Sequence, residues 1–280
     1  GDGNEPTYRS GFPVDMQFNR NVTYAGGNMQ ISARLTQGKQ MHTNLTGQES
    51  TSSVMMFDYM NGVQTDTGTG SNQYAWMFKR APGFFDVVTY TGTGSARTVN
   101  HNLGVAPELM IVKQRDGGSY WAVYSSALGA TKYLQLNGNN AEGTSVAVWN
   151  NTSPTSSVFT VNYAGAVNGS GNEYIAYLFA SLDGISKIGT YTGTGSARNL
   201  DFGFTAGARF FLYKRTDDSQ NWVLFDTGRG ITAGTDYGIP LNEYDAQFSG
   251  DYVDPYSAGI SLTGSVANNS GATFIYLAIA

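Results

Sequence analysis

Histidine, the commonest acid–base side chain near neutral pH, occurs at only two positions of the 280-residue chain, His42 and His101. The chain has no cysteine. Cysteine nucleophiles, cysteine-ligated zinc and iron–sulfur clusters are therefore excluded. The two histidines lie in non-equivalent places of the sequence, so we interpret both as satisfied surface or turn residues.

Paired carboxylates could hydrolyse a glycosidic bond, and four acidic residues are candidates by type: Glu142, Glu173, Asp183 and Asp201. Turn residues surround them, and no motif fixes the distance between any two. Solvated turn carboxylates explain them more simply. We predict that the chain is not an enzyme, and we keep a polysaccharide hydrolase as a second alternative.

Asp116, Asp217 and Asp218 lie between two expected strands, where carboxylates could bind calcium. A calcium loop offers several oxygen ligands at regular spacing, whereas Asp116 is followed only by two glycines and a serine. The pattern favours Asx turns, in which the carboxylate bonds to the nearby backbone. We predict no metal site and no cofactor.

Aromatic residues are the remaining candidates for ligand contacts. Trp121 and Trp222 occupy equivalent places in two similar stretches of sequence, which favours packing in a shared type of core. Aromatic residues without a counterpart are better candidates, because a core would demand them in every copy. By this criterion the predicted glycan-binding residues are Tyr252, Tyr256, Trp149 and Tyr120.

A repeat positions all of these residues. The eight residues Tyr-Thr-Gly-Thr-Gly-Ser-Ala-Arg at 90–97 recur unchanged at 191–198, starting 101 residues later. A closing pattern of aromatic and aliphatic residues at 174–180 has relatives at 72–78 and 274–280. These spacings indicate a tandem duplication with a third, divergent copy. Within the motif, Gly92 and Gly94 predict a tight hairpin turn.

The strand pattern predicts an all-β chain of tandem antiparallel β-sandwich, jelly-roll-like repeats. Short apolar stretches alternate with turns rich in Gly, Asn and Ser, and the second copy is expected to form strands that include 121–124, 132–136, 145–149, 157–161 and 174–179. The predicted organisation is an N-terminal arm or linker (1–10), a divergent and N-terminally incomplete repeat (11–83), and two further repeats (84–184 and 185–280).

Composition limits the partners. The chain carries 16 basic and 21 acidic residues, and only 13% of its residues are charged. It lacks the basic runs that neutralise phosphates, which argues against nucleic-acid binding. It also lacks an apolar stretch of about 18 residues, which argues against membrane insertion. A surface of neutral polar residues suits sugars or a robust extracellular fibre.

The motifs at 84–92 and 101–113, with the closing patterns at 174–180 and 274–280, resemble a repeat of predicted tail-fibre and minor structural proteins of tailed bacteriophages, many of them marine. The resemblance covers about residues 11–280 and brings no catalytic signature. It implies a location on the virion, an extracellular particle surface. It also implies a homotrimer and contacts with other virion proteins.

These observations predict a phage tail fibre or receptor-binding protein that adheres to a host surface glycan or protein without catalysis. Repetition would make many weak contacts multivalent. The alternative is a purely structural virion module, such as a capsid decoration or spacer fibre, with no ligand of its own.

Overall fold

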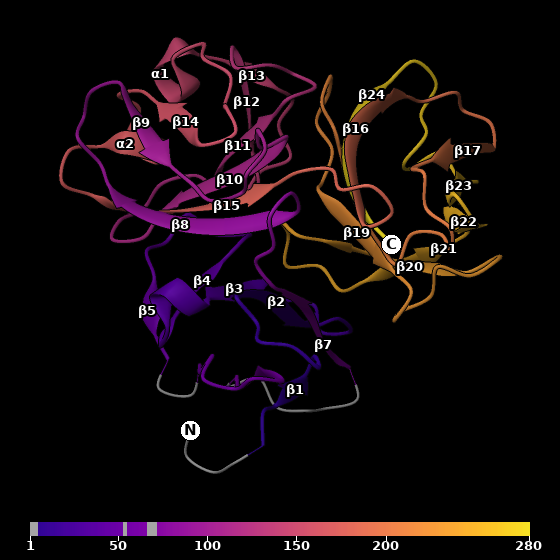
Figure 1. Cartoon of the computed structure of the whole chain (residues 1–280). Coiled ribbons are helices and arrows are strands. Elements are labelled where there is room, and N and C mark those ends of the chain that lie inside the picture. Colours follow the sequence, from indigo (N-terminus) through magenta and orange to yellow (C-terminus); the bar gives the residue numbers. More distant parts are fainter. Residues whose placement is uncertain (1–4, 53–54, 66–71) are drawn as a thin grey trace.

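The chain folds almost entirely into antiparallel strands (Figure 1). This computed structural model describes residues 5–52, 55–65 and 72–280, and it confirms the all-β class. Residues 1–4 of the predicted arm lie outside the described residues. The end of the arm pairs with segment residues: β1 (Tyr8–Arg9) lies antiparallel to β6 (Gly62–Val63).

Three lobes correspond to the residue ranges 11–83, 84–184 and 185–280, which we call segments 1, 2 and 3. Each has one large sheet, and every strand pairing among the described residues joins strands of one segment, apart from β1 just before segment 1. In segment 1 the sheet order is β5 (Ser50–Thr51), β4 (Lys39–His42), β3 (Gln30–Ala33), β2 (Met16–Asn21) and β7 (Gln73–Phe78), with the 3-10 turn η1 (Arg34–Thr36) after β3.

Segments 2 and 3 have six-stranded large sheets and a small second sheet each. In segment 2 the large sheet is β13 (Gly143–Thr144), β12 (Lys132–Gln135), β11 (Ala122–Ser125), β10 (Leu109–Gln114), β15 (Glu173–Phe179) and β8 (Phe85–Thr91), and the small one is β14 (Val158–Val161) with β9 (Arg97–Asn100). In segment 3 the large sheet is β16 (Ser186–Thr192), β24 (Thr273–Ile279), β18 (Phe210–Arg215), β19 (Val223–Asp226), β20 (Asp236–Pro240) and β21 (Phe248–Gly250), and the small one is β17 (Arg198–Asp201), β23 (Gly259–Leu262) and β22 (Val253–Tyr256).

Two short helices occur in segment 2, α1 (Val146–Trp149) and α2 (Gly165–Asn168). The expected strand at 145–149 is therefore wrong. The Ser145 hydroxyl accepts the N–H of Ala147 at 3.2 Å as an N-cap, and Asn150 ends the turn with a left-handed φ of 53°. Four apolar residues fit one helical turn as well as a short strand.

The repeated glycine motif does not form a hairpin. β8 and β9, on either side of it, belong to different sheets. Gly94 has the expected positive φ of 74°, but Gly92 is required for close approach, since a Cβ there would lie 2.1 Å from the Gly169 carbonyl oxygen. The Asn168 side chain holds the loop by accepting the N–H of Thr93 and donating to the carbonyl of Ser95. The loop therefore joins two layers.

One face of each large sheet contributes to a single apolar core that the three segments share. Phe78 of segment 1 packs against Phe179 of segment 2 and Phe210 of segment 3, each at a ring-centroid distance of 5.8 Å. The opposite faces cover separate cores within segments 2 and 3 and a small cluster in segment 1. The lobes are thus packed as one body.

Three seams close the segments into a ring. At each seam two backbone hydrogen bonds of 2.7–3.0 Å run in opposite directions between loops: Glu49 N to Arg115 O and Ser119 N to Thr46 O (segments 1 and 2), Glu142 N to Thr216 O and Gln220 N to Asn139 O (segments 2 and 3), and Gln247 N to Val22 O and Gly26 N to Tyr244 O (segments 3 and 1). Each segment therefore meets the other two through equivalent loops, as in a closed head-to-tail ring.

Candidate functional site

The two equivalent tryptophans are buried and belong to the seams. The Trp121 indole N–H reaches the carbonyls of His42 and Leu45 in segment 1 at 3.2 and 3.0 Å, and Trp222 donates to the Gln135 carbonyl of segment 2 at 2.9 Å. Both rings lie in the shared core. Core packing, the favoured interpretation, is confirmed, and the indole donors additionally join neighbouring segments.

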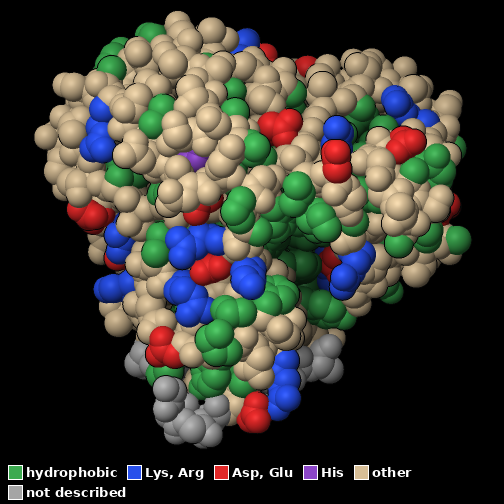
Figure 2. Space-filling model, viewed as in Figure 1, with side chains coloured by type: hydrophobic (Ala, Val, Ile, Leu, Met, Phe, Trp, Pro, Cys, Tyr) green, Lys and Arg blue, Asp and Glu red, His purple; other side chains and the backbone are tan. Residues whose placement is uncertain are grey.

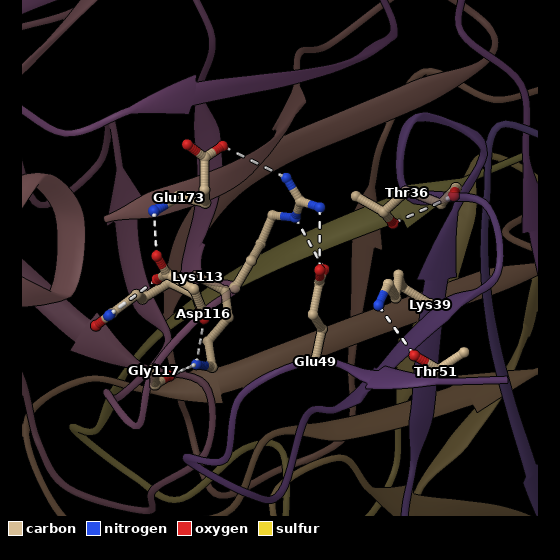
Figure 3. Close-up of polar contacts among 11 residues, drawn as sticks. Thr36, Lys39, Glu49, Thr51, Lys113, Asp116, Gly117 and Glu173 are labelled. Atoms are coloured by element: carbon tan, nitrogen blue, oxygen red, sulfur yellow. Dashed lines mark hydrogen bonds and ion pairs between the residues drawn. The ribbon is translucent and has the colours of Figure 1, made fainter. Parts of the chain in front are cut away.

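Charged residues gather at the seam between segments 1 and 2 (Figure 3). Arg115 donates two hydrogen bonds to the Glu49 carboxylate, at 2.9 and 3.1 Å, and lies 3.7 Å from Glu173. Asp116 accepts the backbone N–H of Glu173 at 3.0 Å. Glu173, one of the candidate hydrolytic carboxylates, is thus part of an ion-pair network that fastens two lobes together.

Two of the aspartates bond to a distant backbone N–H, not to the nearby backbone that the predicted Asx turns require. Asp217 accepts the N–H of Thr273 at 3.2 Å, as Asp116 does for Glu173 at the start of the equivalent strand. The hydrogen bond from Arg215 to Asp217 lowers the pKa of that carboxyl below its usual value. Within residues 5–52, 55–65 and 72–280, no group of three or more acidic or histidine side chains could hold a metal ion.

Three buried cations occupy the same place on the central strand of each large sheet: Arg20, Lys113 and Lys214. Lys113 donates to the carbonyls of Gln114, at the end of its own strand, and of Gly117 beyond it, and Lys214 reaches the Asn139 carbonyl across a seam, at 3.2 Å. Burial lowers the pKa of both lysines to about 8. All their identified bonds are to backbone carbonyls, which assigns them a structural role.

His101 is satisfied by hydrogen bonds, as expected, but it is buried rather than on the surface. Its Nδ1 accepts the N–H of Leu103 at 3.2 Å, which leaves the proton on Nε2 to donate to the Thr155 carbonyl at 3.2 Å. Burial lowers its pKa below the ordinary value. The other histidine, His42, gives its carbonyl to Trp121.

The structure does not bring the four predicted glycan-binding residues together, since Tyr120 and Trp149 lie in segment 2 and the others in segment 3. Trp149 is fully buried and packs edge-on against Tyr124 in the segment 2 core. Its ring offers no face to a ligand in this structure. Tyr120 is half-buried and stacks on Tyr133, so one of its faces is taken.

In segment 3 the two predicted tyrosines differ. Tyr252 packs against Phe248 and Phe225 at centroid distances of 5.5 and 6.1 Å, which makes it part of the core margin. Tyr256 is half-buried and lines a cleft of about 220 Å³ with Ile231. Tyr256 is therefore the one of the four whose surroundings leave room for a small group.

Two other tyrosines are exposed and have no aromatic counterpart in the other segments, so they are better candidates for ligand contacts. Tyr24 and Tyr244 are 62% and 45% exposed, and they lie at the seam between segments 3 and 1, where Gly26 donates to the Tyr244 carbonyl at 2.7 Å. The Tyr24 ring lies over Gly26 and Gly27. The equivalent positions of the other seams hold Gly117 and Thr46, and Asp218 and Asn139. The loops have the same spacing at all three seams, so both tyrosines could have been recognised in the sequence as aromatic residues without a counterpart, but sequence reasoning missed them.

A groove of about 610 Å³ lies at the same seam. Its walls are mainly apolar, and Figure 2 shows hydrophobic side chains around a hollow where the lobes meet. Asp226 is the carboxylate among its described lining residues. It accepts the Trp76 indole N–H at 3.1 Å and pairs with Arg229 at 2.7 Å. The groove therefore lacks the carboxylate pair that glycoside hydrolysis requires.

The chain belongs to the family described as a domain of unknown function, DUF7483, whose model matches residues 81–280. The match spans segments 2 and 3. No curated protein matches the chain. None of the helices in the described residues is long and apolar enough to cross a membrane.

Proposed function

We propose that the chain is a non-catalytic adhesion module of a phage virion appendage, in which three tandem copies of one β-sandwich form a head that contacts neutral glycan on a host surface. The observation that carries the proposal is the pair of exposed tyrosines, Tyr24 and Tyr244, at a single seam. The sequence resemblance to tail-fibre repeats supplies the setting, including the virion location and the homotrimer.

Tyrosine suits this role because its ring gives a large, rigid and amphipathic surface at low cost in conformational entropy. The loop beneath Tyr244 is held in place: buried Arg20 donates to the carbonyls of Glu243, at 3.1 Å, and of Asp245. Glu243 and Asp245 are the sequence neighbours of Tyr244, and carboxylates are acceptors for the hydroxyl groups of a sugar. A contact surface built in advance loses less free energy on binding.

A glycan array printed with neutral bacterial surface polysaccharides tests the proposal. The double variant Tyr24→Ala/Tyr244→Ala should weaken binding at least about tenfold, as expected for two lost stacking contacts. Tyr163→Ala removes a 59% exposed tyrosine from segment 2 and is the matched control. Equal binding by the double variant and the control would exclude this pair as the contact site.

The closed ring and shared core also support the alternative, a structural virion module without a ligand. Light scattering measures the molar mass in solution and so tests the homotrimer that the resemblance implies. A chain that forms a stable trimer but binds nothing on the array would favour the structural module.

A further inference from the structure

The outer edge of β7 has no partner strand in the part of the chain that the structure describes. In segments 2 and 3 the equivalent strands, β15 and β24, are paired on both sides. In segment 1, β7 pairs with β2 alone. Six consecutive residues, Tyr74 to Lys79, line the groove. Because successive side chains point to opposite faces, such a run means that the strand edge itself borders the groove.

The groove is also the place that a strand fills at another seam. Between segments 1 and 2, β8 lies against η1, the turn that follows β3. The equivalent turn in segment 3 follows β19, and its residues Thr227 and Gly228 line the groove opposite β7. β8 lies between its sheet partner β15 and the turn η1. The groove lies between the equivalent elements of the other seam, which are β7 and the turn at Thr227 and Gly228.

The register of β8 defines the strand that would fit. Phe85 lies opposite Phe179 and Val87 opposite Tyr177, and both side chains are buried in the shared core. Phe78 and Trp76 hold the corresponding places on β7. If a strand pairs with β7 and has bulky apolar residues opposite Phe78 and Trp76, those apolar residues will be buried on the same face of the sheet as Phe85 and Val87 of β8.

We propose that the groove binds an extended strand of a partner polypeptide, added antiparallel to β7, with apolar residues at alternate positions. Main-chain hydrogen bonds would give affinity and the apolar groove selectivity, as in β-strand addition. A second copy of the chain would have to release β8 from its own fold to fill the groove, because β8 is paired with β15 along one edge and lies against η1 on its other side. The exposed cations Lys79 and Arg209 at the groove would accommodate an acidic residue such as Asp86 of β8.

The probe is a peptide with the sequence of residues 84–91, extended by two lysines for solubility and titrated into the full chain. It should bind with a Kd of roughly 10 µM and slow hydrogen exchange of the β7 amides. The same peptide with alanine at the positions of Phe85 and Val87 should bind at least about tenfold more weakly.

Thr227→Trp, which places a large ring in the groove, should abolish binding without changing the thermal midpoint. If that variant folds poorly, Ile185→Arg is the substitute, since Ile185 lines the groove and is 47% exposed. Peptide protection at β5 or β21 instead of β7 would overturn the proposal, as would undiminished binding to a folded groove variant. A dimer that dissociates on Thr227→Trp would place a second copy in the groove and overturn it too. Glycan binding is not used as a readout, so the result is independent of the adhesion proposal.

Discussion

Trp76 of segment 1 donates its indole N–H to the carboxylate of Asp226 in segment 3, 150 residues further along the chain. The same carboxylate pairs with Arg229, whose guanidinium carbon lies 5.3 Å from the Trp76 ring centroid. The three side chains form one buried contact between segments 1 and 3, and two of them, Trp76 and Asp226, line the groove.

Asp226→Ala should destabilise the whole chain by about 3–5 kcal/mol, because it leaves the buried Arg229 cation without its carboxylate. Urea unfolding measures the change. Asp218→Ala is the control, since Asp218 is exposed and lies 3.5 Å from Arg215 in a surface pair. Equal losses for the two variants would contradict the assigned role of Asp226.

Asn19→Val should stabilise the chain by about 1–3 kcal/mol. Asn19 is fully buried, and neither polar atom of its side chain has a hydrogen-bond partner among the described residues. The equivalent residue of segment 2 is Val112. Asn21→Val is the same change two residues on, but it removes the acceptor of the Thr23 N–H and hydroxyl and should not stabilise. Thermal unfolding of the two variants distinguishes these outcomes.

The free energy of unfolding should rise with pH above about 8. Burial lowers the folded-state pKa of Lys113 and Lys214 to about 8 from 10.5, so between these values the unfolded chain binds more protons. Urea unfolding at about pH 7.5 and 9 measures the slope, because few unfolded tyrosines ionise about one unit below their ordinary pKa of about 10. Lys113→Met should reduce the slope, whereas Lys187→Met, at an exposed position, is the control. An unchanged slope in Lys113→Met would refute this account.

Gly92→Ala should lower the thermal midpoint sharply, because the new methyl group would lie 2.1 Å from a backbone oxygen that cannot move independently. Gly165→Ala has open space around the new methyl group and should be close to neutral. If both variants melt alike, close approach is not the reason for this glycine.

The repeat spacing and the alternating pattern predict the all-β class, and the equivalence of Trp121 and Trp222 predicts their burial. The local sequence pattern does not predict the role of a residue that contacts a part of the chain far away in the sequence. Gly92 is needed for a loop 77 residues later, at Gly169, and Trp149 is buried because a single helical turn folds inward. The tyrosine pair and the groove lie between segments 1 and 3, which are far apart along the sequence. Short-range periodicity therefore does not show that their residues meet.

The ring also sets an order of events during synthesis. Arg20 bonds to the carbonyl of Glu243, 223 residues away, so the shared core cannot close until segment 3 has left the ribosome. Until then segments 1 and 2 expose the apolar faces of their large sheets, and such surfaces favour aggregation. A chain stalled between segments 2 and 3 should therefore depend on chaperones, although its first two lobes already have their strands.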